Sequence, residues 1–165
     1  MNQNQTTLPL PSLFCKTVDG PVFCRHVPLL DANISFRPLH LTSDLDVIFG
    51  WVNETYARRF WQLNGSKELL EDTYAALLLS PHTHSFIGLI NDQPVAQVDI
   101  YQVAAGELGE HLPAAPNDCG LHLLMLPPRL SRKYLSRELL RSFIQFYFSF
   151  SEAGDLFAEP DQENI

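Results

Sequence analysis

Apolar residues recur along the chain with two periods, one typical of strands and one typical of helices. Alternation over 34–39 (ISFRPL) predicts a strand that ends near Pro38. The apolar side chains of 45–52 then follow helical spacing, and the polar residues 42–44 offer capping oxygens in front of them. A folded core that begins with a strand and a helix follows from this pattern.

The middle of the chain predicts a second helix and a hairpin. Ser66 is placed to cap a helix that Pro81 limits. Residues 84–90 and 94–103 are apolar runs separated by a short polar turn, which is typical of two antiparallel strands. The Gly- and Pro-rich residues 104–119 are predicted to form a loop.

Three further elements complete the pattern. The near-continuous apolar run 120–126 predicts a strand covered on both faces. Residues 134–150 predict the longest helix, and a last strand is expected at 155–158. The inward side chains of that helix are expected to be Leu135, Leu139, Phe143, Ile144 and Tyr147. The order of elements predicts an α+β fold, in which helices flank a mixed, mostly antiparallel sheet.

The N-terminal part has a pattern of its own. Two short apolar runs flank a Val-Asp-Gly-Pro turn within residues 13–30, which predicts a β-hairpin. We therefore divide the chain into an N-terminal extension, residues 1–32, and a domain at 33–165.

Composition excludes several classes of protein. The 165 residues are 45% hydrophobic, enough for one core, and the formal net charge of −8 disfavours a nucleic-acid surface. The three cysteines form no CxxC pair or metal-type cluster, so no metal is expected. No signal-peptide pattern and no apolar run of roughly 20 residues is present. These features predict a soluble, cytoplasmic protein without a membrane contact.

Basic residues cluster at the start of the last helix. Five of the eleven Lys and Arg residues fall within 129–141: Arg129, Arg132, Lys133, Arg137 and Arg141. A helix N-terminus presents unpaired N–H groups and a partial positive charge, so added cations predict a phosphate site. The alternative is a solvated basic helix face.

Several other side chains are candidates for catalysis or binding, and each also has a purely structural explanation. His122 is a general-base candidate within an apolar strand, where a histidine can equally be a hydrogen-bonded core residue. The acidic C-terminal residues can form a site or a solvated tail. Several aromatic residues could line an acceptor pocket or belong to the core: Trp51, Tyr56, Phe60, Trp61 and Tyr101.

Together these segments resemble the GNAT acyltransferases that acylate hydroxylated amines in siderophore assembly, such as N6-hydroxylysine acetyltransferase and mycobactin lysine-acyltransferase. The resemblance covers about residues 33–165, in the order and spacing of that family. The matching pieces are Ile34 to Leu39, Trp51 to Asn53, Phe60-Trp61, Val98 to Tyr101, Asp118 with Gly120 to Leu124, and Ala158 to Asp161 with Asn164.

The resemblance implies roles for particular residues. His122 would be the general base and Asp161 its acidic partner, with acetyl-CoA or another acyl-CoA as co-substrate and no metal. The acceptor would contact Trp51, Trp61, Tyr101 and Asn164. CoA would be bound by the backbone of Leu124, Met125 and Leu126 and by Arg129, Arg132, Lys133, Tyr134 and Leu135.

Two departures from the family are visible. Relatives carry an Arg-Gly-x-Gly-like turn where this chain has no glycine over 130–136, so Arg132 and Lys133 would have to bind phosphate by charge. The complete fold continues past Asn164 with a further helix and strands, which this sequence lacks.

The function expected from the resemblance is acyl transfer to a small hydroxylated amine such as N6-hydroxylysine. Two alternatives stay open: acetylation of an aminoglycoside or another small amine, and a non-catalytic member that binds acyl-CoA or a partner. A homodimer is also compatible with the sequence.

Overall fold

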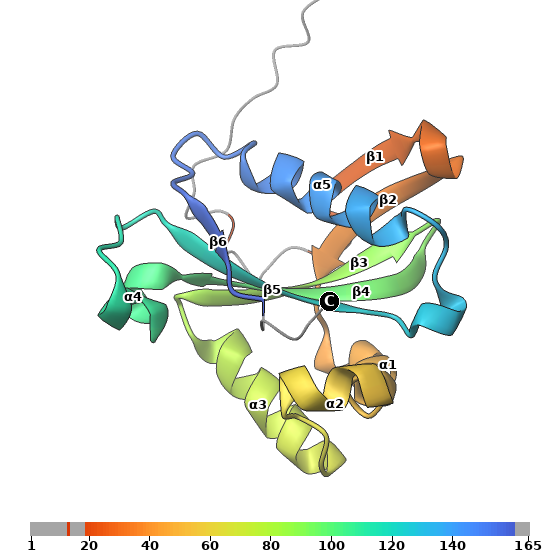
Figure 1. Cartoon of the computed structure of the whole chain (residues 1–165), viewed down its shortest axis with the longest axis horizontal. Helices are drawn as coiled ribbons and strands as arrows, with labels where there is room; N and C mark the ends of the chain where they lie inside the picture. Colours follow the sequence, from red (N-terminus) through yellow and green to blue (C-terminus); the bar gives the residue numbers. More distant parts are fainter. Residues whose placement is uncertain (1–12, 14–18, 161–165) are drawn as a thin grey trace, which may run out of the picture.

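The structure is a computed structural model that describes residue 13 and residues 19–160. Its centre is a six-stranded sheet in which the strands follow chain order (Figure 1). The strands are β1 (Phe23–Val27), β2 (Ala32–Pro38), β3 (Thr83–Ile90), β4 (Gln93–Gln102), β5 (Cys119–Met125) and β6 (Leu156–Ala158). Neighbours from β1 to β5 are antiparallel, and β6 is parallel to β5. The predicted mixed, mostly antiparallel sheet is therefore confirmed.

Helices cover both faces of this sheet (Figure 1). They are α1 (Leu41–Val52), α2 (Thr55–Trp61), α3 (Lys67–Leu79), α4 (Leu108–His111) and α5 (Leu135–Tyr147). Within the described part of the chain, no helix is both long and apolar enough to cross a membrane.

One face of the sheet is closed by α5. Phe36 of β2 meets Phe143 edge-on at a centroid distance of 5.2 Å, and Phe86 of β3 meets Phe146 at 5.6 Å. Gly88 lets the helix approach closely, because an added Cβ would lie 3.1 Å from Leu139. The opposite face lies beneath α1, α2 and α3 (Figure 1), and it is this face that carries the polar residues described below.

The helices differ from prediction in three details. Ser66 caps α3 as expected, since its hydroxyl accepts from the N–H of Leu69. At α1 the predicted capping oxygens are not used as caps: Asp44 instead accepts from the N–H of His40 and pairs with an arginine of β2. The short helices α2 and α4 were not predicted, since residues 104–119, which contain α4, were expected to form a loop. Ile144, predicted to face inward, is 37% exposed.

The N-terminal strand belongs to the main sheet. β1 pairs with β2 along its whole length, and Arg25 on β1 reaches α5, where it binds Glu138 at 3.1 Å and Ser142 at 2.7 Å. Most of the first strand of the predicted hairpin, residues 14–18, lies outside the described residues. The 1–32 boundary thus remains a prediction, while 23–27 is integral to the fold.

Candidate active site

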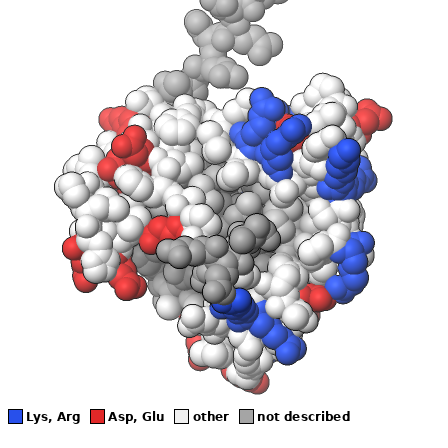
Figure 2. Space-filling model, viewed as in Figure 1, with Lys and Arg blue, Asp and Glu red and all other residues white. Residues whose placement is uncertain are grey.

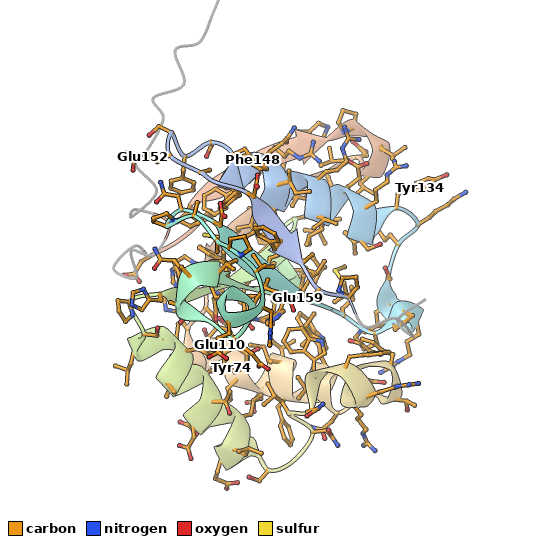
Figure 3. All side chains as sticks on the ribbon, turned by 60° about the vertical axis from the view of Figure 1, so that its left-hand side comes forward. Tyr74, Glu110, Tyr134, Phe148, Glu152 and Glu159 are labelled. Carbon is orange, nitrogen blue, oxygen red and sulfur yellow. The ribbon has the colours of Figure 1, made fainter. Side chains whose placement is uncertain are left out.

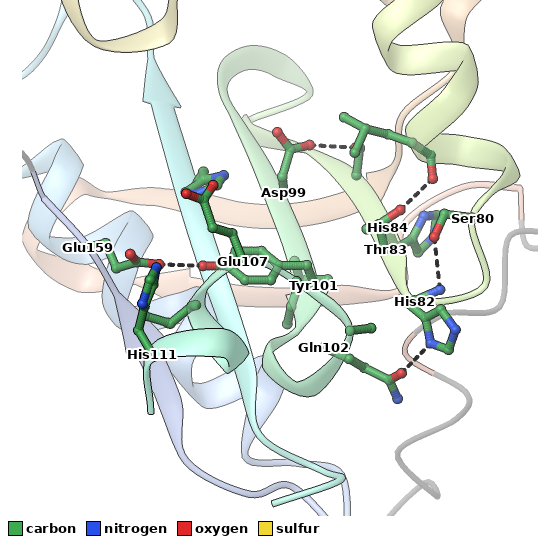
Figure 4. Close-up of a pocket in the computed structure, with 17 residues that line it drawn as sticks. Ser80, His82, Thr83, His84, Asp99, Tyr101, Gln102, Glu107, His111 and Glu159 are labelled. Atoms are coloured by element: carbon green, nitrogen blue, oxygen red, sulfur yellow. Dashed lines mark hydrogen bonds between the residues drawn. The ribbon is translucent and has the colours of Figure 1, made fainter. Parts of the chain in front are cut away.

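A cavity of about 570 Å³ opens on the α3 side of the sheet (Figure 4). It is lined by Leu77, Ser80, His82, Thr83, His84, Ser85, Asp99, Ile100, Tyr101, Gln102, Ala105, Gly106, Glu107, Leu108, His111, His122 and Glu159. No group of three or more His, Cys, Asp and Glu side chains among the described residues is arranged to hold a metal ion.

A row of polar residues crosses three strands at this cavity. Ser85 on β3 is opposite Asp99 on β4, which is opposite His122 on β5. Asp99 is only 7% exposed, and its Oδ1 accepts from the Ser85 hydroxyl at 2.5 Å and from the Gln97 amide. Burial raises the pKa of Asp99 to about 7, although both hydrogen bonds favour the anion. The row therefore holds a carboxyl group that can change charge near neutral pH.

His122 lies among aromatic rings where it faces the cavity. Its ring centroid is 5.1 Å from that of Tyr101 and 6.2 Å from that of Trp61. Desolvation lowers the pKa of His122 below its usual range, while the charge of Glu159 acts in the opposite direction. Because the ordinary pKa of histidine is already about 6.5, the imidazole is neutral at pH 7 and able to accept a proton.

Tyr101 connects the histidine to a carboxylate. Its hydroxyl donates to Oε1 of Glu159 at 2.7 Å. Burial, followed by this hydrogen bond, raises the pKa of Tyr101, so the phenol stays protonated. The ring is opposite Gly120 on β5 and occupies the space that a side chain there would fill. Gly120 thereby allows the Tyr101–Glu159 contact.

Substituting Gly120 with alanine is expected to lower the free energy of unfolding by about 1–3 kcal/mol, because the new Cβ would overlap the Tyr101 ring. Gly50→Ala in α1 is the matched control, since an added Cβ there meets nothing within 4 Å. That control should be neutral or stabilising by up to about 1 kcal/mol. Urea unfolding measures both, and equal effects would contradict the packing argument.

β5 and β6 are paired over only part of their length. The pairing ends at Leu121 opposite Ala158, while β5 continues to Met125. Over 122–125 the edge of β5 that faces away from β4 has no strand partner within the described residues. The two strands therefore separate at the position of His122.

Hydrogen bonds at the two ends of β5 fix the direction of its amides. The N–H of Cys119 donates to Asp155 at 3.0 Å, on the β6 side. Because amides alternate along a strand, those of Leu123 and Met125 also point away from β4. Two adjacent donors of one strand edge are thus directed toward the opening.

The alternation corrects part of the predicted backbone site. The N–H of Leu126 donates to the carbonyl of Val95 at 2.9 Å and is therefore not available to a bound group. The amide of Leu124 points toward β4 by the same alternation, and its side chain is buried. A backbone donor was predicted around Leu123 to Leu126, and within that range Leu123 and Met125 are the residues that direct their amides outward.

Ion pairs divide the basic cluster. The guanidinium group of Arg129 forms a bidentate ion pair with the carboxylate of Glu54, with hydrogen bonds of 2.9 and 2.7 Å. Arg137 and Arg141 both pair with the buried carboxylate of Glu138, at 3.0 and 3.6 Å. Figure 2 shows Lys and Arg gathered on the side of the molecule that carries the start of α5. Three of the five cations are therefore occupied by carboxylates.

The remaining two cations lie in the turn before α5. Arg132 and Lys133 are exposed and have no ion pair within the described residues. Tyr134, which follows them, has a φ of 69° and projects away from the body of the protein (Figure 3). The turn thus adopts the left-handed conformation that favours glycine without containing one. Leu135 begins α5 with its side chain buried.

The structure brings some predicted residues together and separates others. His122 and Tyr101 line the cavity and Trp61 touches His122, whereas Trp51 is buried in α1 away from the lining. The predicted residues Asp161 and Asn164 lie outside the described residues.

Two carboxylates of the cavity, Asp99 and Glu107, were not predicted, whereas Glu159 is one of the acidic C-terminal residues for which a site and a solvated tail were both left open. A charged residue inside the apolar run of β4 is a signal that could have identified Asp99, because burying an unpaired charge is costly. Glu107 lies in the segment predicted as a loop, where the pattern gives no direction for a side chain.

Comparison with known sequences identifies a family. Residues 40–165 match the family described as Acetyltransferase (GNAT) domain. The chain is 34% identical over 106 residues to the N(6)-hydroxylysine O-acetyltransferase of Escherichia coli, a match that covers 64% of this chain and 34% of that protein. It is 26% identical over 128 residues to the N-hydroxyputrescine acetyltransferase of Acinetobacter baumannii, covering 78% and 61%. The chain thus spans less than two thirds of either relative.

Solved structures share the same fold. The aminoglycoside acetyltransferase AAC(6')-Ib in complex with coenzyme A superposes with a TM-score of 0.70. The match covers 80% of this chain and 77% of that one, at 18% sequence identity. The likeness establishes the arrangement of helices and strands.

Proposed function

Because the chain belongs to the GNAT acetyltransferase family, we propose that it transfers an acyl group from an acyl-CoA to a small hydroxylated amine of the N6-hydroxylysine type. One observation supports this most: His122 faces a cavity at the point where β5 and β6 separate. Its neutral imidazole and the outward amides of the same strand are therefore available to one bound group.

His122 acts as the general base in this proposal. The lone pair of the acceptor attacks the thioester carbonyl carbon, the carbon–sulfur bond breaks, and the CoA thiolate leaves. The proton of the attacking group passes to the imidazole, which is neutral at pH 7 because desolvation lowers its pKa. Glu159 stabilises the imidazolium by charge, and Asp161 remains the predicted partner that would orient the ring.

The edge of β5 supplies the donors for the developing oxyanion. The amides of Leu123 and Met125 point away from β4, and the carbonyl of Met125 is held by the hydroxyl of Tyr56. A fixed backbone donor near the reacting carbon stabilises negative charge without reorganising.

The start of α5 fits the phosphates of CoA. The N–H of Leu135 donates to the carbonyl of Arg132, so the phosphates would meet the following N–H groups of the first turn. The side chains of Arg132 and Lys133, which have no ion pair among the described residues, add positive charge there, with Lys133 also lying over the Tyr134 ring. Direct charge pairing by these side chains takes the place of a glycine-rich amide cradle in this proposal.

Calorimetry and a thiol-release assay test the proposal. Acetyl-CoA should bind, and CoA thiol should appear when N6-hydroxylysine is added but not with lysine. A ferric-complex assay separates a hydroxamate product from an O-acyl product. Absence of acetyl-CoA binding at millimolar concentration would favour the non-catalytic alternative, and turnover of kanamycin alone would favour an aminoglycoside acceptor.

Replacing both Arg132 and Lys133 with alanine is expected to weaken CoA binding roughly tenfold, about 0.7 kcal/mol for each exposed charge. Lys67→Ala is the control. This exposed lysine also carries one positive charge, but it pairs with Asp46 on α1 and does not belong to the turn at Arg132 and Lys133. Calorimetry at low salt measures both. Equal affinities for the double variant and the control would place the phosphates elsewhere.

A further inference from the structure

We propose that Tyr101 is a positioning residue for His122: its hydroxyl holds the carboxylate of Glu159 beside the imidazole, and its ring packs against the imidazole itself. The inference rests on the proposed function, in which His122 is the general base. It gives Tyr101 this role in place of the acceptor contact that the family resemblance implies.

Strand pairing does not hold Glu159 in place. The pairing of β5 with β6 ends where Leu121 lies opposite Ala158. Continued by one residue, the same register would place Glu159 opposite His122, but these two described residues are not paired. The hydroxyl of Tyr101 donates to Oε1 of Glu159 at 2.7 Å (Figure 4). A side-chain hydrogen bond therefore fixes the glutamate at the level of the histidine, where the strand pairing has ended.

This hydrogen bond passes over the strand that lies between its two partners. Tyr101 belongs to β4 and Glu159 follows β6, and these two strands lie on opposite sides of β5. Gly120 of β5 is opposite Tyr101, and an added Cβ there would overlap the tyrosine ring. The missing side chain at Gly120 thus gives the tyrosine a path to the glutamate, and the hydrogen bond ties the end of β6 to β4.

The ring of Tyr101 also restricts the orientation of His122. The centroids of the two rings are 5.1 Å apart and their planes meet at 40°. Trp61 of α2 approaches the imidazole edge-on at 6.2 Å. An imidazole in contact with two rings keeps a defined orientation, and a general base needs this to be within reach of the proton that it accepts.

The charge of Glu159 is the second effect of this arrangement on His122. Other titratable groups line the same cavity from β3, β4 and the segment around α4: His82, His84, Asp99, Glu107 and His111. Desolvation lowers the pKa of His122, and the charge of Glu159 acts in the opposite direction. Holding Glu159 in place should therefore favour the imidazolium that forms when the base takes the proton of the acceptor.

A proton titration of His122 tests the inference independently of turnover. NMR of the imidazole signals gives the pKa in each variant, and the signal lost in His122→Ala identifies this residue. Tyr101→Phe keeps the ring and releases the carboxylate, so the proton affinity of His122 should fall roughly two- to fivefold, the range of a partly exposed charge interaction. Glu159→Gln should give a similar fall. The double variant should add little to it, since both changes remove the same contact.

Tyr147→Phe is the matched control. The hydroxyl of Tyr147 also donates to an oxygen, the carbonyl of Asn117 at 3.1 Å, but this tyrosine does not line the cavity. Its loss should lower the free energy of unfolding and leave the titration of His122 unchanged. The same pattern in Tyr101→Phe would mean that Tyr101 has only a structural role, and it would overturn the inference.

Two further outcomes would contradict the positioning role. One is a full additional fall of the His122 proton affinity in the double variant. The other is weaker acceptor binding in Tyr101→Phe with an unchanged titration, which would make Tyr101 an acceptor contact. If the titration changes as expected but no thiol is released with any acceptor, the coupling of Tyr101, Glu159 and His122 stands and the proposed acyl transfer fails.

Discussion

Replacing His122 with alanine is expected to lower kcat for acyl transfer by about 10²- to 10⁴-fold, the usual contribution of a positioned general base. Affinity for CoA should be retained, because His122 lies within β5 and the predicted phosphate-binding turn follows the C-terminal end of that strand. Thiol release and calorimetry on the same variant separate the two effects. Unchanged turnover would exclude His122 as the base.

The pH dependence gives an independent check on the same residue. The pKa of His122 is lowered by desolvation, so the midpoint of the acidic limb of the wild-type rate should lie below the ordinary pKa of histidine. Glu159 opposes this shift, and Glu159→Gln should therefore move the acidic limb to lower pH. His26→Ala on β1 is the matched control, since this exposed histidine contacts Asn33 outside the cavity. It should leave both rate and pH profile unchanged.

The second large effect concerns stability and Asp99. Its pKa is about 7 in the folded protein, against an ordinary value of about 3.9. Between these values the unfolded chain loses a proton that the folded protein keeps, so this group makes stability fall as pH rises. Relative to wild type, Asp99→Asn should gain roughly 3 kcal/mol of unfolding free energy between about pH 4.5 and pH 8.

Urea titrations at several pH values measure this difference directly. The comparison with wild type is necessary because carboxylates with lowered pKa values, such as Asp44, change stability in the opposite direction. Burial alone would raise the pKa of Asp44, but hydrogen bonds from Arg37 and from the His40 N–H outweigh it. Asp72→Asn on the exposed face of α3 serves as the control. A difference between Asp99→Asn and wild type that does not change with pH would mean that Asp99 is already ionised in the folded protein.

Long periodic segments made most of the fold predictable. The helix from Leu135, the β3–β4 hairpin and the cap at Ser66 follow from spacing and local hydrogen bonding, and all are confirmed. The seven-residue α2 has too few turns to show a period, so it was missed. Residues 120–126 were predicted to be covered on both faces, but His122 is exposed, because one face of that half of the strand opens into the cavity.

The site was less predictable than the fold. His122 and Tyr101 were candidates from the sequence pattern and received their roles from the resemblance, and the structure places both at one cavity. The partners of the basic residues could not be read from the sequence, since Glu54 is 75 positions from Arg129 and Glu138 is 113 from Arg25. Such distant pairs depend on packing, which local patterns do not encode. The left-handed conformation of Tyr134 could not be predicted either, because glycine, asparagine and aspartate are the residues that signal it and a tyrosine does not.

The contact between Arg25 and Glu138 has a consequence for where this protein can be shortened or fused to another. A version that starts at residue 33 would lack Arg25 of β1. Glu138 in the first turn of α5 would then have one fewer cation paired with it. It would also expose one side of the Phe36 ring, whose centroid now lies 6.0 Å from that of Phe23 in β1. Tags and fusion partners should therefore be joined ahead of β1. The smallest unit that keeps all the contacts of α5 includes this strand, which the sequence alone assigned to an N-terminal extension.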